Sequence, residues 1–201
     1  MRALWLRLSA VFTLIFALAL AGVHALPYDN ASLIAFFAPP GCAAPCFMGI
    51  RPGVTTHDQA LALLKSQAWV GSVSDSPVSL RWNWNGQQPA FVSDPPNDVQ
   101  GGQINFVSGQ VYSITLSTAT RWAEFFGAFG VPDQEFMRAG ENPNGFYPYV
   151  IHTATYTAYD FEVDTNTLCP FKSRADLWYS PVSIVVPSQP LNGLIPVSRG
   201  C

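Results

Sequence analysis

A segment that joins two cysteines to a capped helix constrains this chain more than any other part of its sequence. It spans Cys42–Trp69 and reads CAAPCFMGIRPGVTTHDQALALLKSQAW. Thr56 and Gln59, three residues apart before an apolar run, form a capping box, which predicts the first turn of a helix. We expect Gly71 to end this helix. Apolar residues recur on one of its faces at helical spacing: Ala60, Leu61, Leu64 and Ala68.

A second helix is predicted by the aromatic residues of Trp122–Phe129, which recur at i, i+3, i+4 and i+7. Gly130 is placed to cap its end, and Pro132 prevents its continuation. The helix-then-strands order therefore occurs twice, in units of about residues 42–117 and 118–187, with an extended tail over 188–201. The fold class we predict is α+β, with two successive helix-plus-antiparallel-strand units and the helices packed on one face of the sheet.

The first set of strands is predicted by alternation of apolar and polar side chains. Residues 80–84 alternate in this way before the Asn85-Gly86 turn, and the Ser108-Gly109 turn separates two further runs around Ile104 and Ile114. The second pair of runs predicts a β-hairpin. We expect three tryptophans to fill the core between helices and sheet: Trp82, Trp84 and Trp122.

The second set of strands carries a row of acidic residues. Tyr149–Val163 reads as strand, and Leu177–Tyr179 with Ile184–Val186 reads as a second hairpin. Three carboxylates alternate with apolar residues: Asp160, Glu162 and Asp164. We interpret them as the solvated face of a half-buried strand. Catalytic carboxylates for sugar hydrolysis and calcium ligands are the functional alternatives.

Residues 1–25 have the pattern of a secretory signal peptide, with two arginines, an apolar core and small residues at Val23-His24-Ala25. We expect cleavage before Leu26, which leaves one globular domain over residues 26–201. An uncleaved anchor is the alternative, but the apolar run is shorter than the about 20 residues that span a bilayer. The predicted location is secreted or extracytoplasmic, in the cell envelope, with no stable membrane span after cleavage.

The chain is poor in charge, which bears on its partners. Charged residues make up 11% of its 201 residues, against about a quarter in average proteins. Removal of Arg2 and Arg7 with the signal would leave 8 of the 10 basic residues and all 13 acidic ones, which gives a formal charge of −5. Nucleic acids and anionic membranes require a clustered basic patch, so we expect neither as a partner.

Four cysteines follow the signal: Cys42, Cys46, Cys169 and Cys201. An even number in an exported chain predicts two disulfides, with three ways to pair them. We favour Cys42–Cys46 with Cys169–Cys201, and pairings that tie the N-terminal loop to the tail are the alternatives. The paired CxxC spacing of zinc sites is absent, and we predict no metal or cofactor.

Two histidines remain after the signal, His57 and His152. We expect His57 to face solvent in the first turn of its helix and His152 to lie on a strand beside threonines. The sequence has no GxSxG elbow and no HExxH helix. We therefore predict no catalytic residue, with a triad assembled in space as the alternative.

Three aromatic residues and one arginine are the candidate binding residues. Tyr147, Tyr149 and Trp178 are candidates for an exposed platform that takes sugar rings or a protein partner. Arg51 is a candidate anion ligand, although a single arginine in a turn more often bonds carbonyls of its own loop.

The residues PCFMGIRPGVTT at Pro45–Thr56 resemble uncharacterised exported bacterial proteins that share a PC-x-x-GIRPG-x-T segment, a helix and a small sheet. In element order, the chain is also similar to outer-membrane assembly lipoproteins and to the β-lactamase inhibitor protein. The first resemblance implies no known activity, and the second implies an interaction role by analogy of fold. The lipidated cysteine of the assembly lipoproteins is missing here.

These observations predict an exported, non-enzymatic binding or cell-envelope-associated module, whose partner is a protein or a cell-surface glycan. The alternative is a secreted hydrolase that acts on glycan or ester bonds.

Overall fold

The computed structural model describes residues 2–25, 30–92, 100–140, 149–170 and 174–187. The chain divides into two compact units, residues 1–30 and 31–201. The first unit contains the helix α1 (Arg2–Ala25), whose described side chains are exposed. Within the described part of the chain, no helix combines the length and apolarity that crossing a bilayer requires. Signal cleavage after Ala25 stays a prediction.

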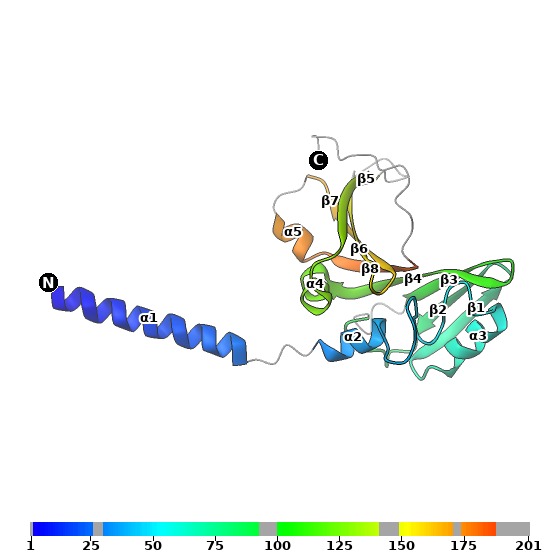
Figure 1. The fold of residues 1–201 in the computed structure, drawn as a ribbon, viewed down its shortest axis with the longest axis horizontal. Helices are drawn as coiled ribbons and strands as arrows, with labels where there is room; N and C mark the ends of the chain where they lie inside the picture. The colour runs from blue at the N-terminus through cyan, green and yellow to red at the C-terminus, as the bar shows by residue number, and fades with distance from the viewer. Residues whose placement is uncertain (1, 26–29, 93–99, 141–148, 171–173, 188–201) are drawn as a thin grey trace. The chain divides into compact units, whose positions relative to one another are not determined.

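The second unit is built around one eight-stranded antiparallel sheet, in the order β1-β2-β3-β4-β8-β7-β6-β5 (Figure 1). The predicted α+β class is confirmed, with the sheet as the dominant part. The strands are β1 (Val70–Ser76), β2 (Ser79–Trp84), β3 (Gln100–Val107), β4 (Gln110–Arg121), β5 (Gln134–Gly140), β6 (Tyr149–Tyr156), β7 (Phe161–Leu168) and β8 (Pro181–Val186).

Each half of the sheet follows a helix in the chain. α3 (His57–Ser66) precedes β1–β4, and α4 (Trp122–Phe129) precedes β5–β8. Because β4 pairs with β8 at the centre, β1 and β5 form the two outer edges of the sheet. Two further helices lie outside this repeated order: α2 (Ala31–Phe37), and α5 (Arg174–Trp178) between β7 and β8. The repeated element order agrees with the predicted duplication, which stays a prediction.

The capping box predicted at the start of α3 is present. The Thr56 amide donates to Gln59 Oε1 at 3.0 Å, and the Gln59 amide donates to Thr56 Oγ1 at 3.5 Å. The helix ends at Ser66, before the predicted Gly71. It ends early because Val70 enters β1 and pairs with Trp84 of β2.

The predicted helix α4 is confirmed between Trp122 and Phe129, and Gly130 follows it with a φ of 80°. Glu124 Oε2 accepts a hydrogen bond from the Arg121 amide at 2.9 Å, which satisfies one free N–H at the start of the helix. The Ser108-Gly109 hairpin between β3 and β4 is also confirmed, with φ values of 52° and 76° at its two turn residues.

One continuous hydrophobic core holds α2, α3 and α4 to the sheet. The tryptophans predicted to be buried are 1%, 3% and 2% exposed: Trp82, Trp84 and Trp122. The Phe125 ring of α4 lies 5.7 Å from Tyr156 and 5.6 Å from Phe161, so α4 packs on the β6–β7 hairpin. The backbone of Gly102 lies against Trp82, where a Cβ atom would overlap the indole ring and the Thr115 carbonyl oxygen.

Two features of the second half differ from the sequence-based prediction. Residues 149–163 form two strands, because the chain turns back over residues 157–160, where Asp160 has a φ of 52°. The strand predicted at Leu177–Tyr179 is wrong. Leu177 and Trp178 complete α5, and Tyr179 follows in a turn, where its amide donates to Ala175 O at 3.1 Å. The Ser180 hydroxyl donates to Asp176 O at 2.7 Å. Strands β1 and β5 were not predicted.

Candidate functional site

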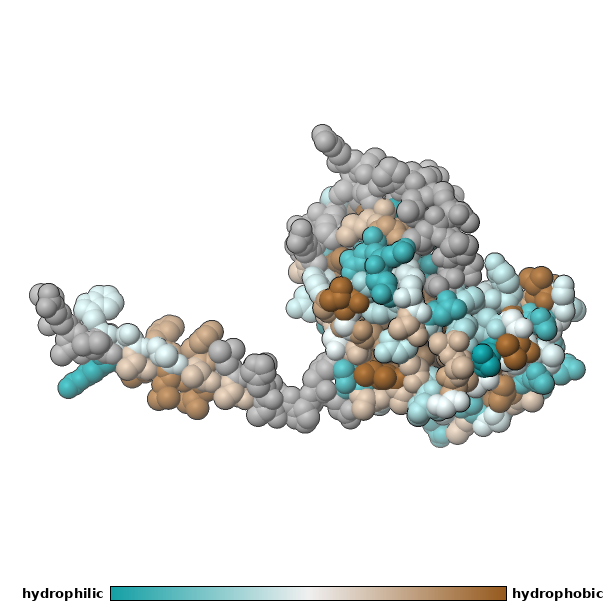
Figure 2. Space-filling model, in the orientation of Figure 1, coloured by the Kyte–Doolittle hydropathy of each residue, from teal (hydrophilic) through white to brown (hydrophobic). Residues whose placement is uncertain are grey.

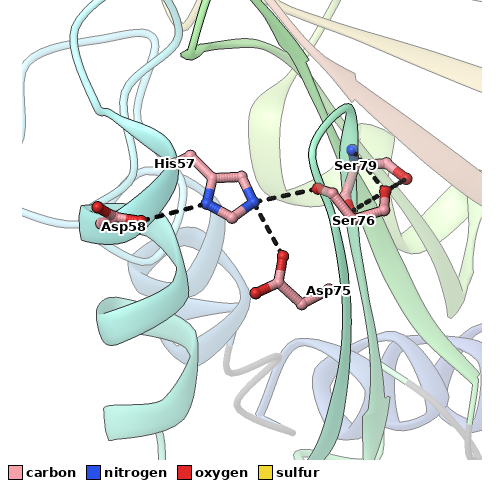
Figure 3. Close-up of polar contacts among 5 residues, drawn as sticks. All are labelled: His57, Asp58, Asp75, Ser76 and Ser79. Carbon is pink, nitrogen blue, oxygen red and sulfur yellow. Dashed lines mark hydrogen bonds and ion pairs between the residues drawn. The ribbon is translucent and has the colours of Figure 1, made fainter.

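His57 links the start of α3 to strand β1 (Figure 3). Its Nε2 lies 3.0 Å from Asp75 Oδ1 and 3.1 Å from the Ser76 carbonyl oxygen, and its Nδ1 lies 3.4 Å from Asp58 Oδ1. The other side of the ring packs on Phe106, with 4.7 Å between centroids. The prediction of a solvent-facing side chain is wrong, because strand β1 lies beside it.

Acceptor oxygens face both ring nitrogens of His57, an arrangement that favours the doubly protonated ring. Burial lowers the pKa of His57, but the contact with Asp58, the Ser76 carbonyl and Asp75 raise it more, so the pKa lies above its ordinary value. The Ser76 hydroxyl does not take part. It donates to Ser79 O at 2.8 Å and accepts from the Ser79 amide at 3.1 Å. These contacts join the first turn of α3 to the end of β1, and the Ser76 hydroxyl is bonded to Ser79 rather than to the His57 ring.

His152 lies inside the core, 2% exposed, on strand β6. Its ring meets Trp122 edge-on with 4.9 Å between centroids, and its Nε2 lies 3.4 Å from Glu135 Oε2. Among the described residues, Nδ1 is buried without a hydrogen-bond partner, as is Oγ1 of Thr165, which pairs with His152 across the sheet. Burial lowers the pKa of His152, against the raising effect of Glu135 and Asp164.

Neither histidine forms a hydrogen bond with a serine, threonine or cysteine side chain among the described residues. The ring nitrogens of His57 contact two carboxylates and a backbone carbonyl, and the His152 side chain is buried in the core. No group of three histidine, cysteine, aspartate or glutamate side chains comes close enough to hold a metal ion in the part of the chain that the structure describes.

The interpretation of the three carboxylates as a solvated face is wrong. Asp160 lies in the β6–β7 turn, Glu162 is only 7% exposed, and Asp164 is half-buried on the same face of β7. Asp164 accepts a hydrogen bond from the Thr153 hydroxyl and lies 3.9 Å from Arg138 Nη2. Burial raises the pKa of Asp164 more than these two groups lower it.

The predicted aromatic platform of Tyr147, Tyr149 and Trp178 stays a prediction, and the structure describes two of its three residues. Tyr149 is half-buried at the start of β6. Trp178 is 37% exposed at the end of α5, where its ring lies 5.4 Å from Phe126. Tyr147 lies outside the described residues. Hydrophobic residues of the second unit are scattered among hydrophilic ones on the face shown in Figure 2.

Arg51 uses its backbone to hold the loop. Its amide donates to Thr55 Oγ1 at 2.8 Å, and its carbonyl accepts from the amides of Val54 and Thr55. Among the described residues, its Nε atom is buried without a hydrogen-bond partner. Whether the terminal nitrogens of this side chain bind carbonyls of its own loop, or an anion, stays a prediction.

The Cys42–Cys46 disulfide is confirmed, with 5.9 Å between the two Cα atoms. It closes the loop that leads from α2 to Phe47 and Ile50, both of which are buried in the core. This pairing excludes the alternatives that tie Cys42 or Cys46 to the tail. The predicted Cys169–Cys201 bridge involves a residue outside the described part of the chain.

A row of polar side chains crosses the first half of the sheet, which sequence reasoning did not single out. In strand β2 the residues alternate between buried, such as Leu80, Trp82 and Trp84, and exposed, such as Arg81 and Asn83. The polar side chains continue in register onto β3 and β4, where Arg81 pairs with half-buried Gln103 and Gln103 with half-buried Thr115. Beyond them, Ser117 of β4 pairs with Ser183 of β8.

Hydrogen bonds connect these side chains in one direction. Arg81 Nε donates to Gln103 Oε1 at 2.9 Å, Gln103 Nε2 donates to Asn105 Oδ1, and Asn105 Nδ2 donates to Ser113 Oγ at 3.0 Å. The row borders an open hollow of about 420 Å³. Its lining includes polar side chains of three strands: Arg81, Asn83, Gln103, Asn105, Thr115 and Ser117.

The signal for this surface was present in the sequence as the polar half of the alternation at residues 80–84 and 103–117. Alternation alone reads as an ordinary solvated face, so the hollow required the structure. Comparison of the chain with known protein families, with curated proteins and with solved structures gave no match.

Proposed function

We propose that this protein is an exported, non-enzymatic binding or cell-envelope-associated module that binds a protein partner. Its binding surface is the polar sheet face, defined here by Arg81, Asn83, Gln103, Asn105, Thr115 and Ser117. The observation that carries the proposal is the connected row of side chains beside an open hollow on strands β2, β3 and β4. A fixed row of donors and acceptors suits a specific partner, because its geometry is set before binding.

The packing of the helices supports this choice of face. Leu80 pairs with Ile104, and Ile104 with Ile114, all of them in the core that contains Leu64 of α3. Leu116 pairs with Ile184, and Ile184 with Val163, in the same core as Phe125 of α4. Side chains alternate between the two faces of a sheet. These pairings support our proposal that both helices lie on one face of the sheet and that the polar residues belong to the other.

The environments of the two histidines also support binding rather than hydrolysis. His57 contacts Asp58, Asp75 and a carbonyl, and His152 is 2% exposed. A nucleophilic site requires a base within reach of a hydroxyl or thiol that a substrate can approach. Neither histidine offers this arrangement.

A protein partner is favoured over a glycan by what lines the hollow. Aromatic rings offer large flat apolar surfaces for stacking, and Trp82, the aromatic residue in the lining, is 1% exposed. Two resemblances agree with this proposal. The Pro45–Thr56 segment resembles exported bacterial proteins, and the element order is similar to that of interaction modules.

The proposal is tested by capture from the source cell's envelope. The exported protein is compared with T115R, which adds a bulky side chain to the polar sheet face, and with A62R, which adds the same group to exposed Ala62 of α3. We expect the wild type and A62R to retain a common partner that T115R loses. A partner retained by T115R and lost by A62R would contradict the proposal. So would a capture that recovers nothing while the protein turns over a generic ester or glycan substrate.

A further inference from the structure

The polar sheet face contains one cation whose charge the described residues do not neutralise. Arg81 is exposed on β2, and its side chain forms a hydrogen bond to Gln103 but no ion pair in the described part of the chain. By contrast, Arg138 lies beside Asp164, and Arg121 lies over the Tyr179 ring at 5.6 Å. The charge of Arg81 is therefore available to a ligand.

The hydrogen bond from Arg81 also orients its guanidinium group. A guanidinium group has five N–H donors in a rigid fork. Nε is used by Gln103 Oε1, which leaves the four donors of the two terminal nitrogens. Gln103 is itself fixed through Asn105, which donates to Ser113. The row of side chains thus holds the fork beside the hollow in advance of any ligand.

The chemistry of the hollow selects the kind of group that fits this fork. Apart from Arg81, the polar side chains that line it in the described part of the chain are neutral amides and hydroxyls, without a carboxylate: Asn83, Gln103, Asn105, Thr115 and Ser117. Arginine binds carboxylates through two parallel hydrogen bonds, and such pairs are strong where neighbouring groups limit access to water. The chain as a whole has a formal charge of −3, so this positive group stands out locally.

We infer that the Arg81 fork binds the side-chain carboxylate of an aspartate or glutamate on an acidic segment of the protein partner. This inference rests on the proposed function, because it names the group that the polar sheet face recognises. The neutral amides of Gln103 and Asn105 then contact the backbone and polar side chains of the same segment. An arginine at the centre of an interface is a common hot spot, and its pairing with a carboxylate gives register and specificity.

The experiment follows the backbone amide signals of the isotope-labelled exported protein by NMR. The probes are the peptide acetyl-Gly-Glu-Gly-Glu-Gly-amide and its counterpart with both glutamates replaced by glutamine. We expect the acidic peptide to shift the signals of Arg81, Gln103 and Thr115 in a saturable way, with at least tenfold weaker binding of the neutral peptide. R81Q should abolish the difference between the two peptides, and R81K should retain only part of it because lysine lacks the fork.

K65Q is the matched control, since Lys65 is an exposed cation on α3 and its loss changes the net charge equally. Binding of the acidic peptide that R81Q leaves intact, or that K65Q weakens as much, would overturn the assignment. An oligogalacturonate that binds this face more tightly than the peptide would overturn the choice of a protein segment. Equal binding of both peptides at the face would overturn the role of Arg81 while leaving the polar sheet face as the binding surface, which the T115R capture tests separately.

Discussion

Asp75 Oδ1 lies 3.0 Å from Nε2 of His57 and joins the first edge strand of the sheet to the first turn of α3. Because β1 has a paired neighbour on one side only, this contact helps to hold the edge in place. The same ring nitrogen reaches the Ser76 carbonyl at 3.1 Å. The histidine thus acts as a bridge between a capped helix and a strand end.

This bridge predicts a pH-dependent stability. The pKa of His57 is raised in the folded state, so its contribution is fully present below the unfolded value of about 6.5 and is lost as pH rises through the folded pKa. We expect D75N to lower the free energy of unfolding by about 0.5 kcal/mol at pH 5.5 and by less at pH 8.5. Urea unfolding at both pH values measures the difference. A loss of equal size at both would show that protonation of His57 contributes nothing.

His152 predicts the opposite pH dependence. Its pKa is lowered by burial, so the unfolded chain binds a proton more readily than the folded one. Stability should therefore fall as pH drops below the unfolded value of about 6.5, by at most about 1.4 kcal/mol per pH unit. We expect the free energy of unfolding of H152Q, measured with urea, to fall less steeply between pH 6.5 and 4.5, the acid limb of its pH dependence. The matched variant H57Q should keep the acid limb, and a steep limb in H152Q would contradict the assignment.

The capping box gives a third prediction. T56A removes the side-chain oxygen that accepts from the Gln59 amide and should lower the free energy of unfolding by about 1 kcal/mol. T56S keeps that oxygen and should lie close to the wild type. Equal stability of T56A and T56S in urea unfolding would mean that the cap does not hold the start of α3.

The loop before α3 gives a fourth prediction. Peptide mapping, without reduction, of the protein produced in an oxidising compartment should yield a fragment in which Cys42 and Cys46 are linked. The paired substitution C42S/C46S should lower the free energy of unfolding by about 2 kcal/mol, the low end expected for so short a loop. The core positions of Phe47 and Ile50 limit the loss, because they anchor the same loop. Four free thiols in the same protein after denaturation would refute both disulfides.

The elements that the sequence predicted well are those specified by local chemistry. Thr56 and Gln59 mark a helix start wherever they occur in this spacing, and Ser108-Gly109 accepts the positive φ values of a hairpin turn. Trp82 and Trp84 alternate with polar residues, which places them on the buried face. These features require no knowledge of the rest of the fold.

The features that were missed depend on distant residues. The edge strand β1, VGSVSDS, is largely polar and becomes a strand by pairing with β2. Glu162 looks solvated in the sequence but is 7% exposed in β7, which pairs with β6 on one side and with β8 on the other. The Trp178 ring lies 5.4 Å from Phe126 of α4, a contact that the local sequence does not indicate.

Site-specific photo-crosslinking is the most direct test of whether a protein partner binds at the polar sheet face. A benzophenone amino acid is placed at Ser117, which lines the hollow, and separately at Ala62 of α3, and the protein is irradiated in its own cell envelope. We expect a discrete protein adduct from position 117 and none from position 62. Adducts from position 62 alone, or from neither position while R81Q and wild type behave alike in capture, would contradict the account.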